Sequence, residues 1–238
     1  MSSPRVIGLI LAGGRSQRMG QDKAFVSLAG RPLIEHVIAR LAPQVDTLVI
    51  SSNAPRENFA AFHLPVLADI HGGFRGPLAG VHAVLVTYPD DIVISVAVDL
   101  PLLPLDLVEQ LKQSWEGTRC RYAAAHDSRD DARDGGGTTP RMEEVEPRRE
   151  QRPRATPGAV AGTAVEGHTE HALAILWPPR RAAALEHYLR TAASVSGWLA
   201  AQGEPVRFPP ASAVALDANL NTPADLARIE ALLAHPAR

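Results

Sequence analysis

The sequence has few of the features that mark membrane, secreted or nucleic-acid-binding proteins. It holds one cysteine, Cys120, which excludes an internal disulfide and a cysteine-rich metal site and fits a reducing compartment. No run of about 18 apolar residues is present, so no membrane span is expected, and the first residues show no signal-peptide pattern. The formal net charge of −2 indicates neither a nucleic-acid partner nor a membrane surface. We therefore expect a cytoplasmic protein.

Lysine is scarce as well. The chain has 24 lysine and arginine residues, but only Lys23 and Lys112 are lysine. A lysine ammonium is a compact point charge on a flexible stem, whereas a guanidinium is a rigid planar fork. In a sequence that otherwise uses arginine, Lys23 indicates a position where lysine itself is needed.

What the chain does have is a regular alternation of strand and helix patterns. Short apolar runs predict strands at 6–11, 47–51, 65–68, 92–98, 171–177 and 205–208. Helices are expected at 32–41, 76–87, 104–113, 180–191, 195–201 and from Thr222 onward, with Thr222 as N-cap and Asp225 as its capping-box acid. This order predicts an α/β fold of three layers, with a mainly parallel, doubly wound (Rossmann-like) sheet that binds ligands beyond the carboxyl ends of its strands.

The composition changes at residues 126–158, which are rich in Arg, Asp, Glu, Gly and Pro and have almost no large apolar side chain. Such a segment cannot bury enough surface to offset the entropy lost on ordering. We predict a disordered or mobile insert there, with an interaction segment as the alternative.

The most informative stretch is the loop after the first strand, LILAGGRSQRMGQDK at 9–23. Gly13 and Gly14 end the apolar run, and Arg15, Arg18 and Lys23 follow. Glycines let backbone N–H groups approach phosphate oxygens, and fixed cations supply the charge that phosphoryl chemistry needs. The Walker A and dinucleotide-binding glycine patterns are both absent. The sequence favours a polyphosphate loop over a plain strand-to-helix turn.

Polar side chains at later strand ends complete a candidate site. Asp99 follows the most apolar strand, where one carboxylate together with phosphate oxygens and water would suit Mg²⁺; a helix N-cap is the alternative. Asp69 ends another strand and could accept hydrogen bonds from a guanine edge or a ribose, or could simply cap its own turn. Asn219 and Asn221 stand in LDANLNTPADL, where turn chemistry is the alternative.

The segment LAGG-x-S-x-RMG-x-DKA resembles the signature of the molybdenum cofactor guanylyltransferases, the molybdopterin-guanine dinucleotide biosynthesis protein A family. VAVDLPLLP, GPLAG and NLNTP extend the resemblance, which covers about 1–117 and 168–233. It implies a single nucleotidyltransferase domain over 1–238. It further implies transfer of GMP from Mg-GTP to the terminal phosphate of (molybdenum-bound) molybdopterin, with release of pyrophosphate.

The resemblance also implies roles for individual residues. The catalytic residues would be Lys23, Arg18 and Asp99, and Mg²⁺ would be bound by Asp99 and Asn219. The nucleotide would be bound by Leu11, Ala12, Gly13, Gly14, Lys23, Ser51, Asp69, Gly76, Pro77, Leu78 and Asp99. Expected partners are GTP, molybdopterin and, transiently, molybdenum-cofactor insertion proteins or apo-molybdoenzymes, with no nucleic acid and no membrane.

Alternatives remain open. LAGG and GPLAG favour GTP over a cytidylyltransferase that acts on the same pterin. A sugar-phosphate nucleotidyltransferase and a non-catalytic nucleotide-binding protein that delivers the cofactor are further alternatives. The chain also departs from the family pattern. Ser51, with Asn53 two residues on, replaces a usual Asn, Ala172 replaces a usual Pro, and Ala193-Ser194 stand where relatives often carry a basic residue. We expect His171 to be structural.

Overall fold

The computed structural model describes residues 3–13, 22–70, 76–113, 115, 120–123, 174–191, 194–206, 216 and 218–234. All of them belong to one unit of the chain, made of Met1–His126 and Glu170–Arg238. The predicted insert at 126–158 lies outside the described residues, so it remains a prediction, as does the single-domain assignment.

A seven-stranded sheet forms the centre of this unit. Its order is β5 (Val66–Leu67), β4 (Thr47–Ser51), β1 (Val6–Leu11), β6 (Ile92–Ala97), β8 (Ala174–Trp177), β7 (Cys120–Ala123) and β9 (Gly203–Val206). Every strand is parallel to the others except β8, which pairs antiparallel with both β6 and β7. The central β1 and β6 are apolar almost throughout and buried along their length, as strands covered on both faces must be.

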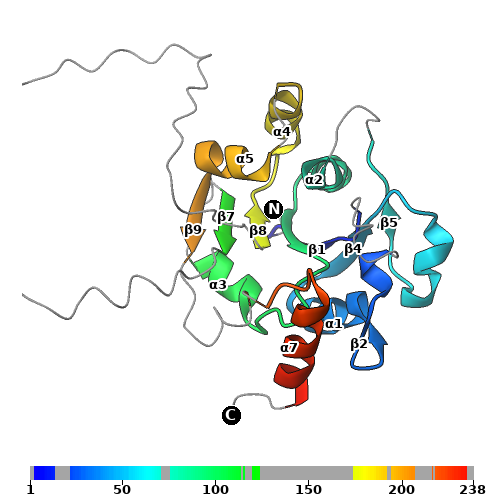
Figure 1. The fold of residues 1–238 in the computed structure, drawn as a ribbon. Helices are drawn as coiled ribbons and strands as arrows, with labels where there is room; N and C mark the ends of the chain where they lie inside the picture. Colours follow the sequence, from blue (N-terminus) through cyan, green and yellow to red (C-terminus); the bar gives the residue numbers. More distant parts are fainter. Residues whose placement is uncertain are drawn as a thin grey trace, which may run out of the picture. The chain divides into compact units, whose positions relative to one another are not determined.

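Helices cover both faces of this sheet (Figure 1). On one face, α1 (Leu33–Leu41) and α3 (Leu107–Gln113) share a core with Ile10 of β1. On the other, α2 (Pro77–Thr87), α4 (Ala182–Leu189) and α5 (Val195–Gln202) pack with Ile7 and Leu9. Neighbouring residues of β1 thus serve opposite layers, because side chains alternate along a strand. The predicted three-layer, doubly wound α/β fold is confirmed.

A third, smaller core joins distant parts of the chain. The hairpin of β2 (Ser27–Leu28) and β3 (Arg31–Pro32) turns through Ala29 and Gly30, both at positive φ (49° and 78°). Leu28 of this hairpin packs with Leu220 and with Ile229 of α7 (Pro223–Ala234). The β2–β3 hairpin and the segment near residue 220 are therefore neighbours in space.

Element bounds differ from the prediction where the pattern is short. The helix expected at 104–113 begins only at Leu107, because a run of turns carries the chain from β6 into it. The strand expected at 205–208 is described as Gly203–Val206, and β7 at Cys120–Ala123 was not predicted. Short 3₁₀ helices also appear, η2 (Lys23–Phe25), η3 (Ala42–Gln44) and η4 (Arg56–Phe62). No helix within the described ranges has the length and apolar character that crossing a membrane requires.

Candidate functional site

The carboxyl ends of β1, β4 and β6 meet at one edge of the sheet. Ala12 N donates to the Ser51 carbonyl (3.0 Å), and Val98 N donates to the Leu11 carbonyl (3.2 Å), so the strand ends stay in register as the chains leave the sheet. The strand order reverses at β1, with β4 on one side and the later β6 on the other. In open α/β sheets, ligands bind in the crevice at such a point.

Lys23 and Asp99 form an ion pair at this edge. Lys23 Nζ donates to Asp99 Oδ2 at 2.8 Å and to Asn221 Oδ1 at 2.7 Å. The side chains of Lys23 and Asp99 are 12% and 21% exposed, so they are sheltered but can be reached from solvent. Lys23 opens η2, which Asp22 caps by accepting from Ala24 N (3.0 Å). Two polar residues far apart in the sequence, Asp99 and Asn221, thus converge on the ammonium group of Lys23.

Asn219 also binds the Asp99 carboxylate. With its amide nitrogen facing Asp99, the orientation that the surrounding acceptors require, it donates to Oδ1 (3.0 Å), Oδ2 (3.2 Å) and the Asp99 carbonyl (3.3 Å). Leu220 N also donates to the Asp99 carbonyl (3.0 Å). Asp99 therefore caps no described helix, since α3 begins only at Leu107. The amide oxygen is the only atom of the Asn219 side chain left to bind a metal.

The start of α7 fixes the position of Asn221. Asp225 Oδ2 accepts from Asn221 N (3.0 Å), Thr222 N (2.8 Å) and Thr222 Oγ1 (2.9 Å), and Asp225 N donates to Thr222 Oγ1 (3.2 Å). This is the predicted capping box, and these donors, Thr222 first, lower the pKa of Asp225. Asn221 was singled out from the sequence together with Asn219, but a site role was predicted for Asn219 alone. Its place in NLNTP, two residues after Asn219, is the sequence signal that could have identified it.

The remaining predicted nucleotide-binding residues lie along the same edge. Asp69, beyond β5, pairs with Asn53, beyond β4. Ser51 is buried, and its hydroxyl lies where a Cβ at position 80 would stand, so it packs directly against Gly80 of α2. Gly76 precedes α2 with φ of 98°, a conformation that favours glycine, and Pro77 and Leu78 begin the helix. Gly14 and Arg18 lie outside the described residues, as do His171 and Ala172.

The donors at this edge fit a cation that is shared with a ligand. The described residues contain no group of three or more His, Cys, Asp or Glu side chains that could enclose a metal ion on their own. Asp99 is a single accessible carboxylate, and each of its oxygens can accept more than one partner. Mg²⁺ is commonly bound by one or two protein carboxylates together with phosphate oxygens and water. The site therefore fits magnesium that arrives with a polyphosphate.

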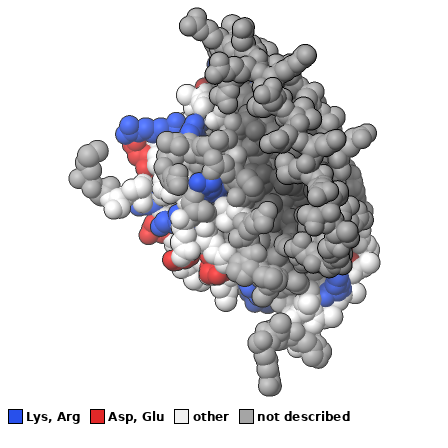
Figure 2. Space-filling view, turned by 90° about the vertical axis from the view of Figure 1, so that its left-hand side faces the viewer, with Lys and Arg blue, Asp and Glu red and all other residues white. Residues whose placement is uncertain are grey.

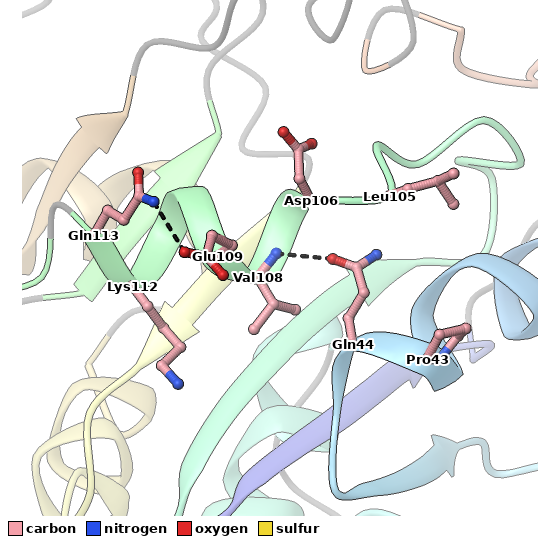
Figure 3. A pocket seen from close by; sticks show the side chains of 8 residues that line it. All are labelled: Pro43, Gln44, Leu105, Asp106, Val108, Glu109, Lys112 and Gln113. Carbon is pink, nitrogen blue, oxygen red and sulfur yellow. Dashed lines mark hydrogen bonds between the residues drawn. The ribbon is translucent and has the colours of Figure 1, made fainter.

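A hollow of about 780 Å³ lies elsewhere, between η3 and α3 (Figure 3). It is lined by Pro43, Gln44, Leu105, Asp106, Val108, Glu109, Lys112 and Gln113, and none of the predicted site residues is among them. Some of its polar groups have structural partners: Gln44 Oε1 accepts from Val108 N (3.0 Å), and Gln113 donates to Glu109 (3.0 Å). Figure 2 shows that basic and acidic side chains lie close together on the described part of this face.

Curated proteins whose sequences are similar to this chain are named as guanylyltransferases. A molybdenum cofactor guanylyltransferase of Yersinia pestis (strain Pestoides F) is 46% identical over 122 residues, which is 51% of this chain and 61% of that protein. Its counterpart in Yersinia pseudotuberculosis serotype O:1b (strain IP 31758) is 45% identical over the same shares. The alignment thus spans about three-fifths of the length of these curated relatives.

Solved structures share the fold at lower identity. Molybdopterin-guanine dinucleotide biosynthesis protein A from Archaeoglobus fulgidus matches with a TM-score of 0.65 and 19% identity, over 96% of this chain and 98% of that one. A CMP:2-keto-3-deoxy-manno-octonic acid synthetase complexed with CTP matches with a TM-score of 0.60 and 17% identity, over 99% and 100%. Residues 8–206, most of the chain, match the family model described as the MobA-like NTP transferase domain. The chain belongs to this family.

Proposed function

We propose that the protein transfers GMP from Mg-GTP to the terminal phosphate of molybdopterin, releasing pyrophosphate and forming the guanine dinucleotide cofactor. The observation that supports this most directly is the cluster of Lys23, Asp99, Asn219 and Asn221 at the carboxyl edge of the sheet, where Val98 N donates to the Leu11 carbonyl. It combines a cation, a carboxylate and two amide side chains at a strand-order reversal, where a bound nucleoside triphosphate needs charge neutralisation and a cation ligand.

For this reaction the protein needs mainly to position the two substrates and to neutralise charge on the phosphates. An oxygen of the acceptor phosphate attacks the α-phosphorus of GTP, and the bond from that phosphorus to the bridging oxygen breaks as pyrophosphate leaves. The attacking oxygen is already an anion, so no general base is required. Lys23 would neutralise charge on the triphosphate, and Arg18 would add a second cation from the same loop.

Asp99 would hold the magnesium ion, with the Asn219 amide oxygen as a further ligand. When bound, such an ion would neutralise charge on the phosphates. Without nucleotide, Lys23 and Asp99 satisfy one another. We infer that substrate binding exchanges this contact, so that Lys23 turns to phosphate and Asp99 to the cation. The exchange gives each of these sheltered side chains a new charged partner, so neither charge is left without one.

The base is assigned to guanine on three grounds. The sequence has the LAGG and GPLAG segments, the curated relatives are guanylyltransferases, and Asp69 offers a carboxylate at the same edge. A cytidylyltransferase acting on the same pterin is the nearest alternative, because one solved neighbour binds CTP. The alternative without enzymatic activity is a protein that binds the nucleotide and delivers the cofactor.

One experiment separates these functions. Purified protein is given Mg²⁺ and molybdopterin with GTP or with CTP, and pyrophosphate release is measured for the wild type, Asp99→Ala and the control Asp106→Ala. We expect release with GTP, loss of release in Asp99→Ala, and an unchanged rate in Asp106→Ala. Release with CTP alone would reassign the base. GTP binding without release would indicate a delivery protein, and full activity of Asp99→Ala would contradict the metal assignment.

The cellular setting follows from this activity. We propose that the protein works in the cytoplasm, where a chain with one cysteine stays reduced, and that it hands its product to molybdenum-cofactor insertion proteins or apo-molybdoenzymes by transient contact. Co-purification with such a partner, dependent on the presence of product, would test this.

A further inference from the structure

Asn53 and Asp69 hold each other through two hydrogen bonds. Asn53 Nδ2 donates to Asp69 Oδ2 at 2.8 Å, and Asp69 N donates to Asn53 Oδ1 at 3.0 Å. The side-chain amide of Asn53 therefore binds both the carboxylate and the backbone N–H of Asp69. A carboxylate held at one oxygen and at its own peptide nitrogen has lost most of its freedom to turn.

Both residues stand on rigid supports at the carboxyl edge of the sheet. Ser52 N donates to the Leu67 carbonyl (3.0 Å), which continues the pairing of β4 with β5 past the strand ends. Ser52 Oγ accepts from Ala54 N (3.1 Å), which fixes the turn that carries Asn53. The pair is thus aligned by the sheet rather than by a loose loop.

The pair also lies next to the proposed phosphate loop. A Cβ built on Gly13 would stand 3.6 Å from Ser52 Cα and 3.9 Å from Asn53 N. Asn53 is exposed, and Asp69 is half-buried. A nucleotide whose phosphates lie on Gly13 would have its base or sugar within reach of Asp69.

Among the described residues, only one carboxylate oxygen of Asp69 has a hydrogen-bond partner. Oδ2 accepts from Asn53, whereas no hydrogen bond joins Oδ1 to any other described residue. We propose that Asn53 is a positioning residue that sets base specificity, by holding the Asp69 carboxylate with its free edge toward the Watson–Crick edge of guanine. The proposal rests on the proposed function, since it assumes that the substrate is GTP.

The chemistry of the two bases explains why a fixed carboxylate selects between them. Guanine presents two neighbouring donors, N1–H and the 2-amino group, to which a carboxylate can offer both oxygens. Cytosine presents one donor, its 4-amino group, beside the lone pair of N3, which would face a carboxylate oxygen and be repelled. A carboxylate that could turn freely would accept the single donor of cytosine and avoid N3, so the discrimination depends on the restraint that Asn53 supplies.

Ser51 offers no substitute for this restraint. Its hydroxyl packs against Gly80 of α2, and its carbonyl accepts from Ala12 N. Neither group is free to contact a base, so base selection at the end of β4 rests on Asn53.

The test compares GTP with ITP, which keeps N1–H and lacks the 2-amino group. Steady-state pyrophosphate release with Mg²⁺ and molybdopterin is measured for the wild type, Asn53→Ala, Asn53→Asp and the matched control Asn58→Ala, an exposed asparagine on the same connection with no side-chain hydrogen bond in the described structure. The wild type should prefer GTP over ITP by about tenfold in kcat/KM, the effect of one hydrogen bond to a charged group.

We expect Asn53→Ala to raise KM for GTP by about threefold to tenfold with kcat little changed, and to bring the GTP to ITP ratio close to one. Asn53→Asp should do the same or more, because two carboxylates then face each other, while Asn58→Ala should behave as the wild type. A role in folding alone would lower the melting temperature and active fraction without moving the GTP to ITP ratio.

Two failures are distinguishable. If the wild type releases pyrophosphate from CTP alone, or from neither nucleotide, the proposed function is wrong. If the wild type uses GTP and prefers it to ITP, and Asn53→Ala keeps the same KM and the same ratio, the function stands and the positioning role of Asn53 is wrong.

Discussion

Charged and polar side chains gather at both edges of the sheet, but they are bonded differently. At the amino edge, Asp91 accepts from Arg5 N (3.1 Å) and from the Arg5 guanidinium (2.7 Å to Nη2), and Asp46 accepts from Val6 N (2.7 Å). These carboxylates bind backbone groups at the start of β1. At the carboxyl edge, Lys23, Asp99 and Asn221 bind mainly one another's side chains.

This difference separates carboxylates that hold the strands in place at the amino edge from polar side chains that are proposed to bind ligand at the carboxyl edge. A buried backbone N–H needs an acceptor, so the amino-edge carboxylates are required for the strands to begin where they do. The side-chain network at the carboxyl edge closes on itself, and a ligand can replace its members without uncovering the sheet. We therefore expect substitutions at the carboxyl edge to lower activity and substitutions at the amino edge to lower stability.

The largest effect is expected at Asp99. Asp99→Asn should reduce turnover about a thousandfold, because it removes the carboxylate proposed to hold the cation. The free energy of unfolding should change by no more than about 1 kcal/mol, the usual limit for a partly exposed polar side chain. Pyrophosphate release and chemical denaturation measure the two quantities, with Asp106→Asn as control. A stability loss as large as the activity loss would remove the contrast between the edges.

Lys23 should come next. Lys23→Ala should lower kcat/KM about a hundredfold, since it removes one charge-assisted contact to the triphosphate. Lys23→Arg should recover only part of this, because a planar fork does not fit a site that encloses a compact ammonium between Asp99 and Asn221. Lys112→Ala, which changes the only other lysine, should match the wild type in the same assay.

Asn221 should have a smaller effect, of about tenfold in kcat/KM for Asn221→Ala. Its amide oxygen holds Lys23 at 2.7 Å without needing to touch the substrate. Asn221→Asp keeps an oxygen acceptor and should retain more activity than the alanine variant. Equal losses in the two variants would show that the amide nitrogen, rather than the contact to Lys23, matters.

At the amino edge, Asp91→Asn should leave kcat/KM unchanged and destabilise the fold by about 1–2 kcal/mol, through weakened hydrogen bonds to Arg5. For a chain of this length that corresponds to a melting temperature lower by about 2–8 °C. Thermal unfolding followed by circular dichroism provides the measurement, and a drop in activity at a temperature where the variant is fully folded would contradict the assignment.

The stability that Asp91 contributes at the amino edge should depend on pH. Hydrogen bonds from the Arg5 side chain, with help from the Arg5 backbone, lower the pKa of Asp91 below its ordinary value of 3.8. The folded state thus binds this proton less tightly than the unfolded state, so the stabilisation is complete above about pH 4 and is lost as the pH falls below it. The stability difference between wild type and Asp91→Asn should be constant from about pH 7 to 5 and shrink from about pH 4 to 2.

Much of the fold follows from local patterns. The run IVISVAV predicts a doubly covered strand, and β6 occupies Ile92–Ala97 at the centre of the sheet. The antiparallel direction of β8 has no local signature, because an apolar run looks the same whichever way it points. The hairpin of β2 and β3 escapes prediction because two-residue strands show no periodicity.

That several candidate residues lie at one edge of the sheet was predictable from the sequence, but their contacts were not. Strand ends identified Asp69 and Asp99, since carboxyl ends of parallel strands share one edge. That Lys23 lies between Asp99 and Asn221 depends on the packing of α7 against the β2–β3 hairpin, which no spacing encodes. The pairing of Asn53 with Asp69 likewise depends on the register of β4 with β5.

The contact between Lys23 and Asn221 has a consequence for how the molecule is made. The ribosome synthesises the chain from the N-terminus, so Lys23 and Asp99 exist long before Asn221, and the family match ends at residue 206, short of it. A nascent chain can form the pair of Lys23 and Asp99, but its lysine gains the second anchor only after α7 has emerged and packed. The full set of contacts around Lys23 would then form only late in synthesis, so a partly made chain would hold an incomplete site.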